Sequence, residues 1–579
     1  MFDRRSTFGE ALADPEARAI LEDYLPGAAE SPLATQFRDG HLGSLLALVP
    51  ALADPAERER FWTRLAVVGP DLVRPAEAPA IAADPAYESS DVPVGSARVT
   101  LPESPTRWSP VELSFDGPAH GNFFIDVDLA AVFTRAGERI RMGGFYDGDG
   151  RYAVRFLPDA EGDWSFVTES TARSLDGITG TVHVGPPRPG AHGPVRVDGF
   201  HFRHADGTRH RPLGTTAYAW THQDEALQGQ TLATLATAPF VKLRFCIFPK
   251  SYQYNSNEPD DFPFPGSLAE GFDTTRFDPA HFRRLERRIA ELDALGIQAD
   301  LILFHAYDRW GFADLGTAAD DRYVRYVVRR LSGFPNIWWS MANEYDLVWS
   351  KDEADWERLA GIVTEEDPAG HLRSIHNCIP FYDHARPWIT HVSAQRIDLY
   401  KTAENVDEWR RRWGKPVVVD ECAYEGDIDQ GWGNISGQEL TRRFWEGAVR
   451  GGYVGHGETY LRDDEVLWWS KGGVLHGSSP ARIAFLEKVL ADAPGGVLDP
   501  VHSEFDLPVG AADGYRLAYF GFGRPRFRRL VLPEGEWRID VLDTWQMTID
   551  PVPGTHRGET RVELPGREFM ALRMIRVGP

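Results

Sequence analysis

Two glutamates each close an apolar run that is typical of a buried strand. Glu344 follows the letters WWSMAN, and Glu421 follows KPVVVD. A carboxylic acid in a largely apolar setting, which the run before Glu344 predicts for that residue, keeps its proton to higher pH, as a general acid requires. A second carboxylate close to it can act as a nucleophile or as a base. The two runs therefore predict chemistry carried by a pair of carboxyl groups.

The spacing of the two glutamates suggests how a fold brings them together. They are 421 − 344 = 77 positions apart, which is three strand-and-helix units of about 25 residues each. Strand-like and helix-like segments alternate around them, as in parallel sheets with crossover helices. Eight segments have strand character: 211–220, 240–248, 297–305, 336–344, 372–378, 389–395, 416–422 and 453–461. Eight such units in roughly 280 residues predict an α/β fold, the (β/α)₈ TIM barrel.

The helices between these strands have readable ends. Asp278 and Pro279 are typical of the N-cap and the first position of a helix, and Gly296 of its C-terminal end. Ser436 and Glu439 have the spacing of a capping box. These ends support the division into strand-and-helix units.

In such a barrel the reactive groups lie at the carboxyl ends of the strands. Glu344 then ends strand four and Glu421 ends strand seven, on opposite sides of the mouth. There the two carboxyls can flank one glycosidic bond. A separation of roughly 5 to 5.5 Å supports double displacement, whereas roughly 6.5 to 9.5 Å supports direct attack by water. The sequence leaves this separation open.

Other predicted strand ends carry polar and aromatic side chains. Hydrogen-bonding groups among aromatic planes are what a hydroxyl-rich ring requires. The substrate-binding residues predicted in this way, together with Asn343, are Trp220, Arg244, His305, Tyr307, Asp308, His376, Gln395, Glu458, Trp468 and Trp469. Trp338 and Trp339 are expected to pack within the barrel instead. Glu425, in the same loop as Glu421, remains an alternative nucleophile.

Composition narrows the classes of partner and cofactor. The formal charge is −24 and no run of lysine or arginine forms a basic surface, which argues against nucleic acid and membrane partners. Three cysteines in 579 residues cannot form a disulfide framework, and their spacing matches no zinc pattern. We therefore expect no metal or cofactor and a cytoplasmic location. A homo-oligomer is compatible with the sequence.

Patterning divides the rest of the chain. Residues 1–73 have helical spacing and predict a small helical domain, and 74–95 are a Pro- and Ala-rich linker. Residues 96–185 contain short alternating runs and predict a β-sandwich. The barrel is expected over 194–494, and a second β-sandwich over 495–579.

The motifs WWSMANE and KPVVVDE resemble those of the clan A glycoside hydrolases. That resemblance implies a (β/α)₈ barrel with an Asn-Glu acid/base after strand four and a glutamate nucleophile after strand seven. More narrowly, residues 96–579 resemble bacterial multi-domain hydrolases with an apiosidase-like barrel. In those proteins an immunoglobulin-like domain precedes the barrel and a β-sandwich follows it. The pattern FYDGDGRYAVRFLPDAEGDW at residues 145–164 is similar to one in their immunoglobulin-like domain.

The resemblance implies a role for three residues of this chain. Glu344 is expected to be the acid/base, Asn343 the donor to the sugar 2-hydroxyl, and Glu421 the nucleophile of a retaining reaction. The expected substrate is a carbohydrate, a β-glycoside or a pentoside. The long segment 249–273 suggests a wall on one side of the site, which favours exo action.

Two other classes of function remain open at this stage. A metal-dependent hydrolase barrel could gather an ion with His305, His376, His391 and Asp420, although strand one lacks the His-x-His pattern common in such barrels. A carbohydrate-binding protein without catalysis is the second alternative, suggested by the accessory domains.

Overall fold

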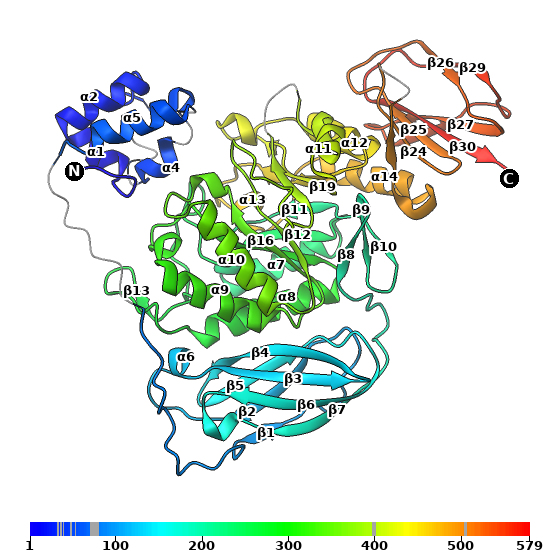
Figure 1. The fold of residues 1–579 in the computed structure, drawn as a ribbon. Helices are drawn as coiled ribbons and strands as arrows, with labels where there is room; N and C mark the ends of the chain where they lie inside the picture. The colour runs from blue at the N-terminus through cyan, green and yellow to red at the C-terminus, as the bar shows by residue number, and fades with distance from the viewer. Residues whose placement is uncertain are drawn as a thin grey trace.

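The computed structural model describes residues 1–578 except 32, 33, 35–37, 39, 47, 48, 53, 70–79, 397–400 and 503–505. Its central part is a barrel of parallel strands surrounded by helices (Figure 1). No helix in these described ranges combines the length and the apolar character needed to cross a bilayer.

The eight predicted barrel strands are all present. They are β11 (Gly214–Thr216), β12 (Lys242–Cys246), β15 (Gln298–His305), β16 (Ile337–Asn343), β17 (Leu372–Ser374), β18 (Val392–Gln395), β19 (Val417–Glu421) and β21 (Tyr453–His456). Their order in the sheet is β17-β16-β15-β12-β11-β21-β19-β18. A parallel bridge between His376 and Ser393 links the two outer strands of this order. The predicted (β/α)₈ barrel is therefore confirmed.

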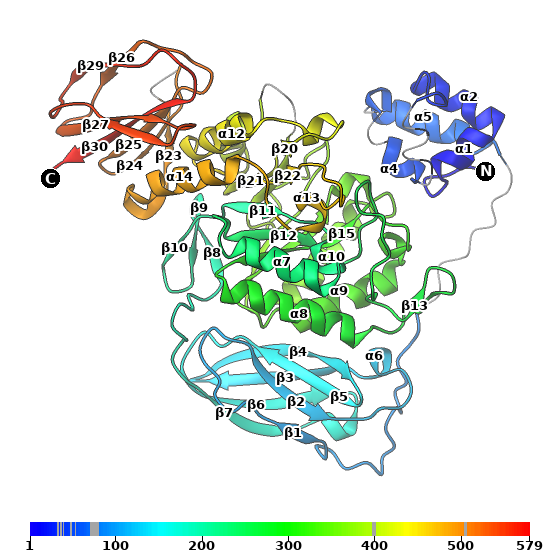
Figure 2. The same ribbon diagram turned by 180° about the vertical axis from the view of Figure 1, so that it is seen from behind.

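Helices cover the outside of the strands. They are α7 (Glu225–Leu235), α8 (Pro279–Ala294), α9 (Thr317–Leu331), α10 (Glu353–Glu366), α11 (Val406–Trp413), α12 (Gly437–Val449) and α14 (Ser479–Ala491). Figure 2 shows α7 and α8 on the face turned away in Figure 1. Asp278 caps α8 and Ser436 caps α12 through their side chains. Residues 375–391, all described, contain no helix between β17 and β18, so one predicted crossover helix is absent.

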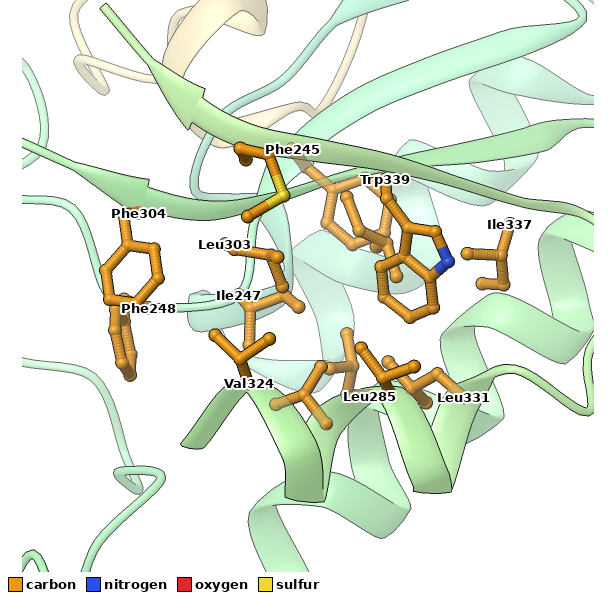
Figure 3. Close-up of a cluster of buried hydrophobic side chains, with 14 of the residues drawn as sticks. Phe245, Ile247, Phe248, Leu285, Leu303, Phe304, Val324, Leu331, Ile337 and Trp339 are labelled. Carbon is orange, nitrogen blue, oxygen red and sulfur yellow. The ribbon is translucent and has the colours of Figure 1, made fainter. Parts of the chain in front are cut away.

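Large apolar side chains fill the layer between strands and helices. In Figure 3 Phe245 of β12 and Leu303 of β15 face Leu285 of α8 and Val324 of α9. Trp339 is fully buried in the same layer, as its predicted packing role requires.

The inside of the barrel is polar at its centre. Lys242 Nζ donates to Asp300 at 2.6 Å and to Asp420 at 2.7 Å, and all three side chains are buried. At the amino ends of the strands, β8 (Val195–Asp198) and β9 (His201–His204) form part of a three-stranded antiparallel sheet. Phe202 of this sheet packs on Trp338. This sheet therefore closes the barrel at the amino ends of its strands.

The first described residues form a cluster of short helices, α1 (Phe8–Ala13), α2 (Pro15–Tyr24), α4 (Leu42–Leu46) and α5 (Pro55–Leu65), shown in blue in Figure 1. This cluster touches the barrel beyond the end of β16. Ser44 Oγ donates to the Leu347 carbonyl, and the rings of His41 and Trp349 lie 4.8 Å apart. The N-terminal segment therefore reaches the rim of the barrel mouth.

Residues 98–184 form a seven-stranded antiparallel sheet in the order β1-β2-β5-β4-β3-β6-β7, from β1 (Arg98–Thr100) to β7 (Thr179–Val184). It packs on α8 and α9 through buried charges. Arg155 of β5 (Arg151–Phe156) donates to Glu286 at 3.0 Å, and Arg330 donates to the same carboxylate at 2.6 Å. Arg330 also pairs with Asp147 at 2.9 Å.

Beyond the barrel, residues 499–577 form two antiparallel sheets. One has six strands, from β23 (Asp499–Val501) to β30 (Met570–Val577), and the other pairs β26 (Phe527–Val531) with β29 (Glu559–Glu563). Tyr515 Oη donates to the carbonyl of Val489 in α14 at 2.8 Å. The C-terminal sheets therefore contact the barrel on the side of α14.

Candidate active site

A cavity of about 1060 Å³ opens at the carboxyl ends of the barrel strands. Glu344 and Glu421 both line it. The other lining residues come from strand ends, from the loops that follow them and from the N-terminal segment: Arg38, Gly40, His41, Ser44, Tyr218, Lys250, Ser251, Tyr252, Gln253, Tyr254, Ser256, Ala306, Tyr307, Asp308, Arg309, Asn343, Leu347, Cys378, Gln395, Tyr424, Asp429, Trp432 and Trp469.

Glu344 is the first residue after β16. Its backbone is left-handed, with φ 53° and ψ 59°, a conformation that is uncommon for a residue with a side chain and that often marks a functional position. Its Oε2 accepts hydrogen bonds from Tyr307 Oη and, at 3.1 Å, from Asn343 Nδ2. These two donors stabilise the ionised carboxylate and fix its orientation.

Asn343 is itself held from below. Its Oδ1 accepts from Tyr218 Oη at 3.0 Å and from an Arg244 amino group at 3.3 Å. Arg244 also donates to Ser340 Oγ at 3.0 Å and is fully buried. Because its carbonyl side is occupied, the amide must present its NH₂ group toward Glu344 and the cavity.

Glu421 ends β19 and has a different environment. Its Oε1 is buried and has no hydrogen-bond partner among the described residues. Burial raises the pKa of Glu421 to about 8 from an ordinary value of 4.5, and the nearby Tyr424 opposes this shift. A pKa of about 8 means that this carboxyl holds a proton at neutral pH.

The polar contacts of Glu344 and the burial of Glu421 differ from the sequence-based expectation, which placed Glu344 in the apolar setting. The indoles of Trp338 and Trp339 and the side chain of Met341 are fully buried inside the barrel layers and do not line the cavity. Successive strand residues point to opposite faces of a sheet, so the apolar run before Glu344 packs the barrel and leaves the carboxyl to polar neighbours. Glu421 is the carboxyl that burial perturbs.

Aromatic rings form one wall of the cavity. Trp469 lies 4.9 Å from Trp432, 5.8 Å from Tyr218 and 6.0 Å from Tyr252, measured between ring centroids. The backbone amide of Tyr218 donates to the Trp469 carbonyl at 2.9 Å, which ties this wall to the first strand. Rings of this kind suit the apolar faces of a sugar.

Five of the predicted substrate-binding residues line the cavity with the two glutamates. They are Asn343, Tyr307, Asp308, Gln395 and Trp469. Asp308 has a structural task as well, because its carboxylate accepts from the backbone amides of Trp310 and Ala313.

The other six predicted residues lie behind the cavity wall: Trp220, Arg244, His305, His376, Glu458 and Trp468. All are at most 2 % exposed. Trp468 Nε1 donates to Thr215 Oγ1 at 2.8 Å, and His305 Nε2 contacts the Phe248 carbonyl at 3.3 Å. Arg244 lies in the middle of β12 and Trp468 at the start of α13 (Trp468–Lys471), so neither is at a strand end, and all six side chains belong to the packing around the cavity.

Glu425, the alternative nucleophile, is also absent from the cavity lining. It is fully buried, and its carboxylate accepts from the Ser478 amide at 2.7 Å, the Ser479 amide at 3.0 Å and Tyr460 Oη at 3.0 Å. These hydrogen bonds hold the loop that leads into α14. The position of Glu425 therefore favours Glu421 as the reactive residue.

Glu425, His456 and Glu458 are the one group of potential metal ligands found among the described residues. Both carboxylates already accept backbone amide hydrogen bonds, Glu458 from Gly477 at 2.7 Å. Such donors stabilise negative charge in place of a cation. None of the residues that suggested a metal-dependent hydrolase, His305, His376, His391 and Asp420, belongs to this group, and its histidine, His456, was not predicted.

Several lining residues were not among those predicted. Tyr252 and Tyr254 belong to the long segment after β12, where the letters SYQY offered a signal. Trp432 and Tyr424 lie close to Glu421 in the loop after β19, as does Asp429. The N-terminal residues Arg38, His41 and Ser44 carried no local signal, because only tertiary packing brings them to the barrel.

Comparison with known proteins supports the barrel assignment. A family model described as an apiosidase-like catalytic domain matches residues 198–473. Two domains of unknown function, DUF5060 and DUF5605, match residues 104–171 and 505–575. No curated protein matches the chain.

Solved structures extend the comparison to most of the chain. A crystal structure of a candidate glycoside hydrolase from Bacteroides vulgatus has 37 % identity and a TM-score of 0.78, covering 82 % of this chain and 100 % of that one. A glycoside hydrolase family 5 protein from the same organism shares the fold, with 15 % identity, a TM-score of 0.53, and coverage of 66 % and 94 %. The chain belongs to the glycoside hydrolases that have an apiosidase-like catalytic barrel.

Proposed function

We propose that this protein hydrolyses a glycosidic bond by retaining double displacement, with Glu421 as nucleophile and Glu344 as acid/base. The observation that carries the proposal is the shared cavity. Two buried carboxyls from the ends of strands four and seven line it, and the Asn343 amide lies beside Glu344. This matches the arrangement that the motifs around both glutamates imply.

In the first step, ionised Glu421 attacks the anomeric carbon while Glu344 gives its proton to the departing oxygen. The Tyr307 hydroxyl and the Asn343 amide both donate to Glu344 Oε2. They stabilise the carboxylate that forms as this proton leaves. In the second step Glu344 takes a proton from water, and the resulting hydroxide displaces Glu421 from the anomeric carbon.

The burial of Glu421 bears on the first step. A charge on this carboxyl is unfavourable because the group is buried, as its pKa of about 8 indicates. Ionising Glu421 at neutral pH therefore costs free energy, and forming the ester with the sugar, which removes the charge, recovers that cost. The reactive form needs Glu421 ionised and Glu344 protonated at the same time, so kcat/KM of the free enzyme should follow a bell-shaped pH profile with one of its two limbs near pH 8.

Exo action on a β-glycoside or a pentoside remains the proposed substrate preference. Residues 250–254, Ser256 and the N-terminal residues Arg38, His41 and Ser44 contribute to the cavity wall. Walls on these sides favour a short substrate over a long polymer that runs through the site.

Azide rescue tests the assignment of the two roles. A panel of aryl glycosides first identifies a substrate of the wild-type protein. Glu421→Ala and Glu344→Ala should both lose most of the activity, and azide should restore part of it in each. The Glu421 variant should yield a glycosyl azide of inverted configuration, and the Glu344 variant one of retained configuration.

Exchanged configurations of these products would show that the two roles are reversed. Full activity of the Glu421 variant would overturn the mechanism.

A further inference from the structure

Lys250 stands in the cavity wall, four residues beyond β12. Its side chain is 4 % exposed. The ammonium nitrogen lies 3.7 Å from the ring centroid of Tyr218, 4.4 Å from that of Tyr307 and 4.9 Å from that of Trp469. Lys250 is therefore a cation surrounded by aromatic faces at the mouth of the barrel.

The other buried lysines of the described chain are neutralised by acids. Lys242 Nζ has Asp300 and Asp420 at 2.6 and 2.7 Å, and Lys351 Nζ has Asp320 at 2.9 Å. Lys250 Nζ has no carboxylate oxygen within 4.0 Å among the residues that the structure describes. Burying an ammonium is costly unless it is paired.

Contacts with ring faces offset part of this cost. A role for Lys250 in packing alone would rest on these contacts. Two facts favour a binding role. Lys250 lines the substrate cavity instead of closing a core. The two rings closest to it, Tyr218 and Tyr307, donate to Asn343 and Glu344. The Lys250 ammonium thus contacts two tyrosine rings whose hydroxyl groups hydrogen-bond to Asn343 and Glu344.

We propose that Lys250 binds the carboxylate of a uronic acid unit, so that the substrate is an acidic glycoside. This inference rests on the proposed hydrolysis and specifies its substrate class. An ammonium–carboxylate hydrogen bond is among the stronger polar contacts in a dry site.

The remaining charges of the cavity fit this role. Glu344, Glu421 and Asp429 line the same space and would repel an anionic sugar without a compensating cation. Of the two lining arginines, Arg309 already pairs with Glu258, and Arg38 is an exposed residue of the N-terminal segment. Burial lowers the pKa of Lys250 to about 8, so that the side chain is charged in neutral solution and loses its charge as pH rises through that value.

The test uses pairs of aryl glycosides that differ only at C6. One pair is 4-nitrophenyl β-D-glucuronide and 4-nitrophenyl β-D-glucoside, and the other is the corresponding galacturonide and galactoside. The wild-type protein should prefer the uronide. The preference is measured as kcat/KM for the uronide divided by kcat/KM for the neutral glycoside. Lys250→Met should lower this ratio about 10- to 100-fold, the range expected for one hydrogen bond to a charged group. Lys250→Arg should retain part of the preference. Lys488→Met, at an exposed position of α14, is the matched control and should keep the wild-type ratio.

A preference for the neutral sugar in the wild type, or an equal loss on both sugars in Lys250→Met, would overturn the inference. Binding separates this failure from that of the proposed function. Methyl β-D-glucuronide and methyl β-D-galacturonide are titrated into the wild-type and Lys250→Met proteins, with the neutral methyl glycosides as comparison. Binding of an acidic sugar that requires Lys250 supports the inference even if no glycoside is cleaved. Identical titrations of both proteins contradict it whether or not hydrolysis occurs.

Discussion

Replacement of Glu421 by glutamine should stabilise the folded protein while it abolishes turnover. Burial raises the pKa of Glu421 to about 8 from 4.5. A folded-state pKa above the unfolded value means that the folded protein keeps a proton that the unfolded chain releases. Stability is then complete below pH 4.5 and falls as pH rises toward 8. Glutamine has nearly the same shape and cannot ionise, so it removes this loss.

The size of the effect follows from the pH interval. Between pH 4.5 and pH 7 the wild-type protein loses about 1.4 kcal/mol per pH unit, or about 3 kcal/mol. With an unfolding entropy of roughly 1 kcal/mol per kelvin for the barrel and its associated sheet, this is about 3 °C in Tm. Thermal unfolding of both proteins at pH 4.5, 6 and 7.5 measures the difference at each pH.

The stabilisation by Glu421→Gln should be near zero at the lowest pH and should grow as pH increases. Glu286→Gln is the matched control of opposite sign. Burial raises the pKa of Glu286, but the charges of Arg155 and Arg330 outweigh this effect, so that the pKa is lowered overall. That substitution should destabilise the protein near neutral pH, and less so in acid. A Glu421→Gln protein whose Tm difference from wild type does not change with pH would refute the reasoning.

Three further predictions concern the site. Glu344→Gln should slow glycosides with poor leaving groups far more than activated aryl glycosides, which need little protonation; equal slowing in steady-state assays would contradict the acid role. Dialysis against a strong chelator should leave the hydrolysis rate unchanged, because two carboxyls suffice; a loss that zinc or manganese restores would contradict the mechanism. Glu425→Gln should lower Tm by several degrees, since it weakens the hydrogen bonds from Ser478 and Ser479. Active-site titration of that variant should still find turnover per folded molecule within about tenfold of wild type, a range compatible with a supporting role.

The barrel could be predicted from the sequence because strand-like and helix-like segments alternate with clear breaks between them, although β11 and β17 have only three residues each. The exception is the connection from β17 to β18, where residues 375–391 form no helix. Both glutamates were predicted for the same reason, since each one ends a strand-like segment, and both line the cavity.

The substrate wall was predicted less completely because neighbouring residues at a strand end point in different directions. Trp469 faces the cavity while Trp468 is buried against Thr215, and the letters WW do not distinguish them. Asn343 lines the site while Arg244 supports it from below. The contribution of Arg38 and His41 depends on contacts between distant parts of the chain, which no local pattern contains.

The buried charges between the seven-stranded sheet and the barrel have a consequence for how the protein unfolds. Arg155 of the sheet and Arg330 of α9 share the carboxylate of Glu286. If the sheet separated first, Arg330 would lose Asp147, Glu286 would lose Arg155, and Tyr326 would lose its contact with Phe145, which is unfavourable. We therefore expect the sheet and the barrel to melt in a single calorimetric transition, and the barrel expressed alone to be poorly soluble.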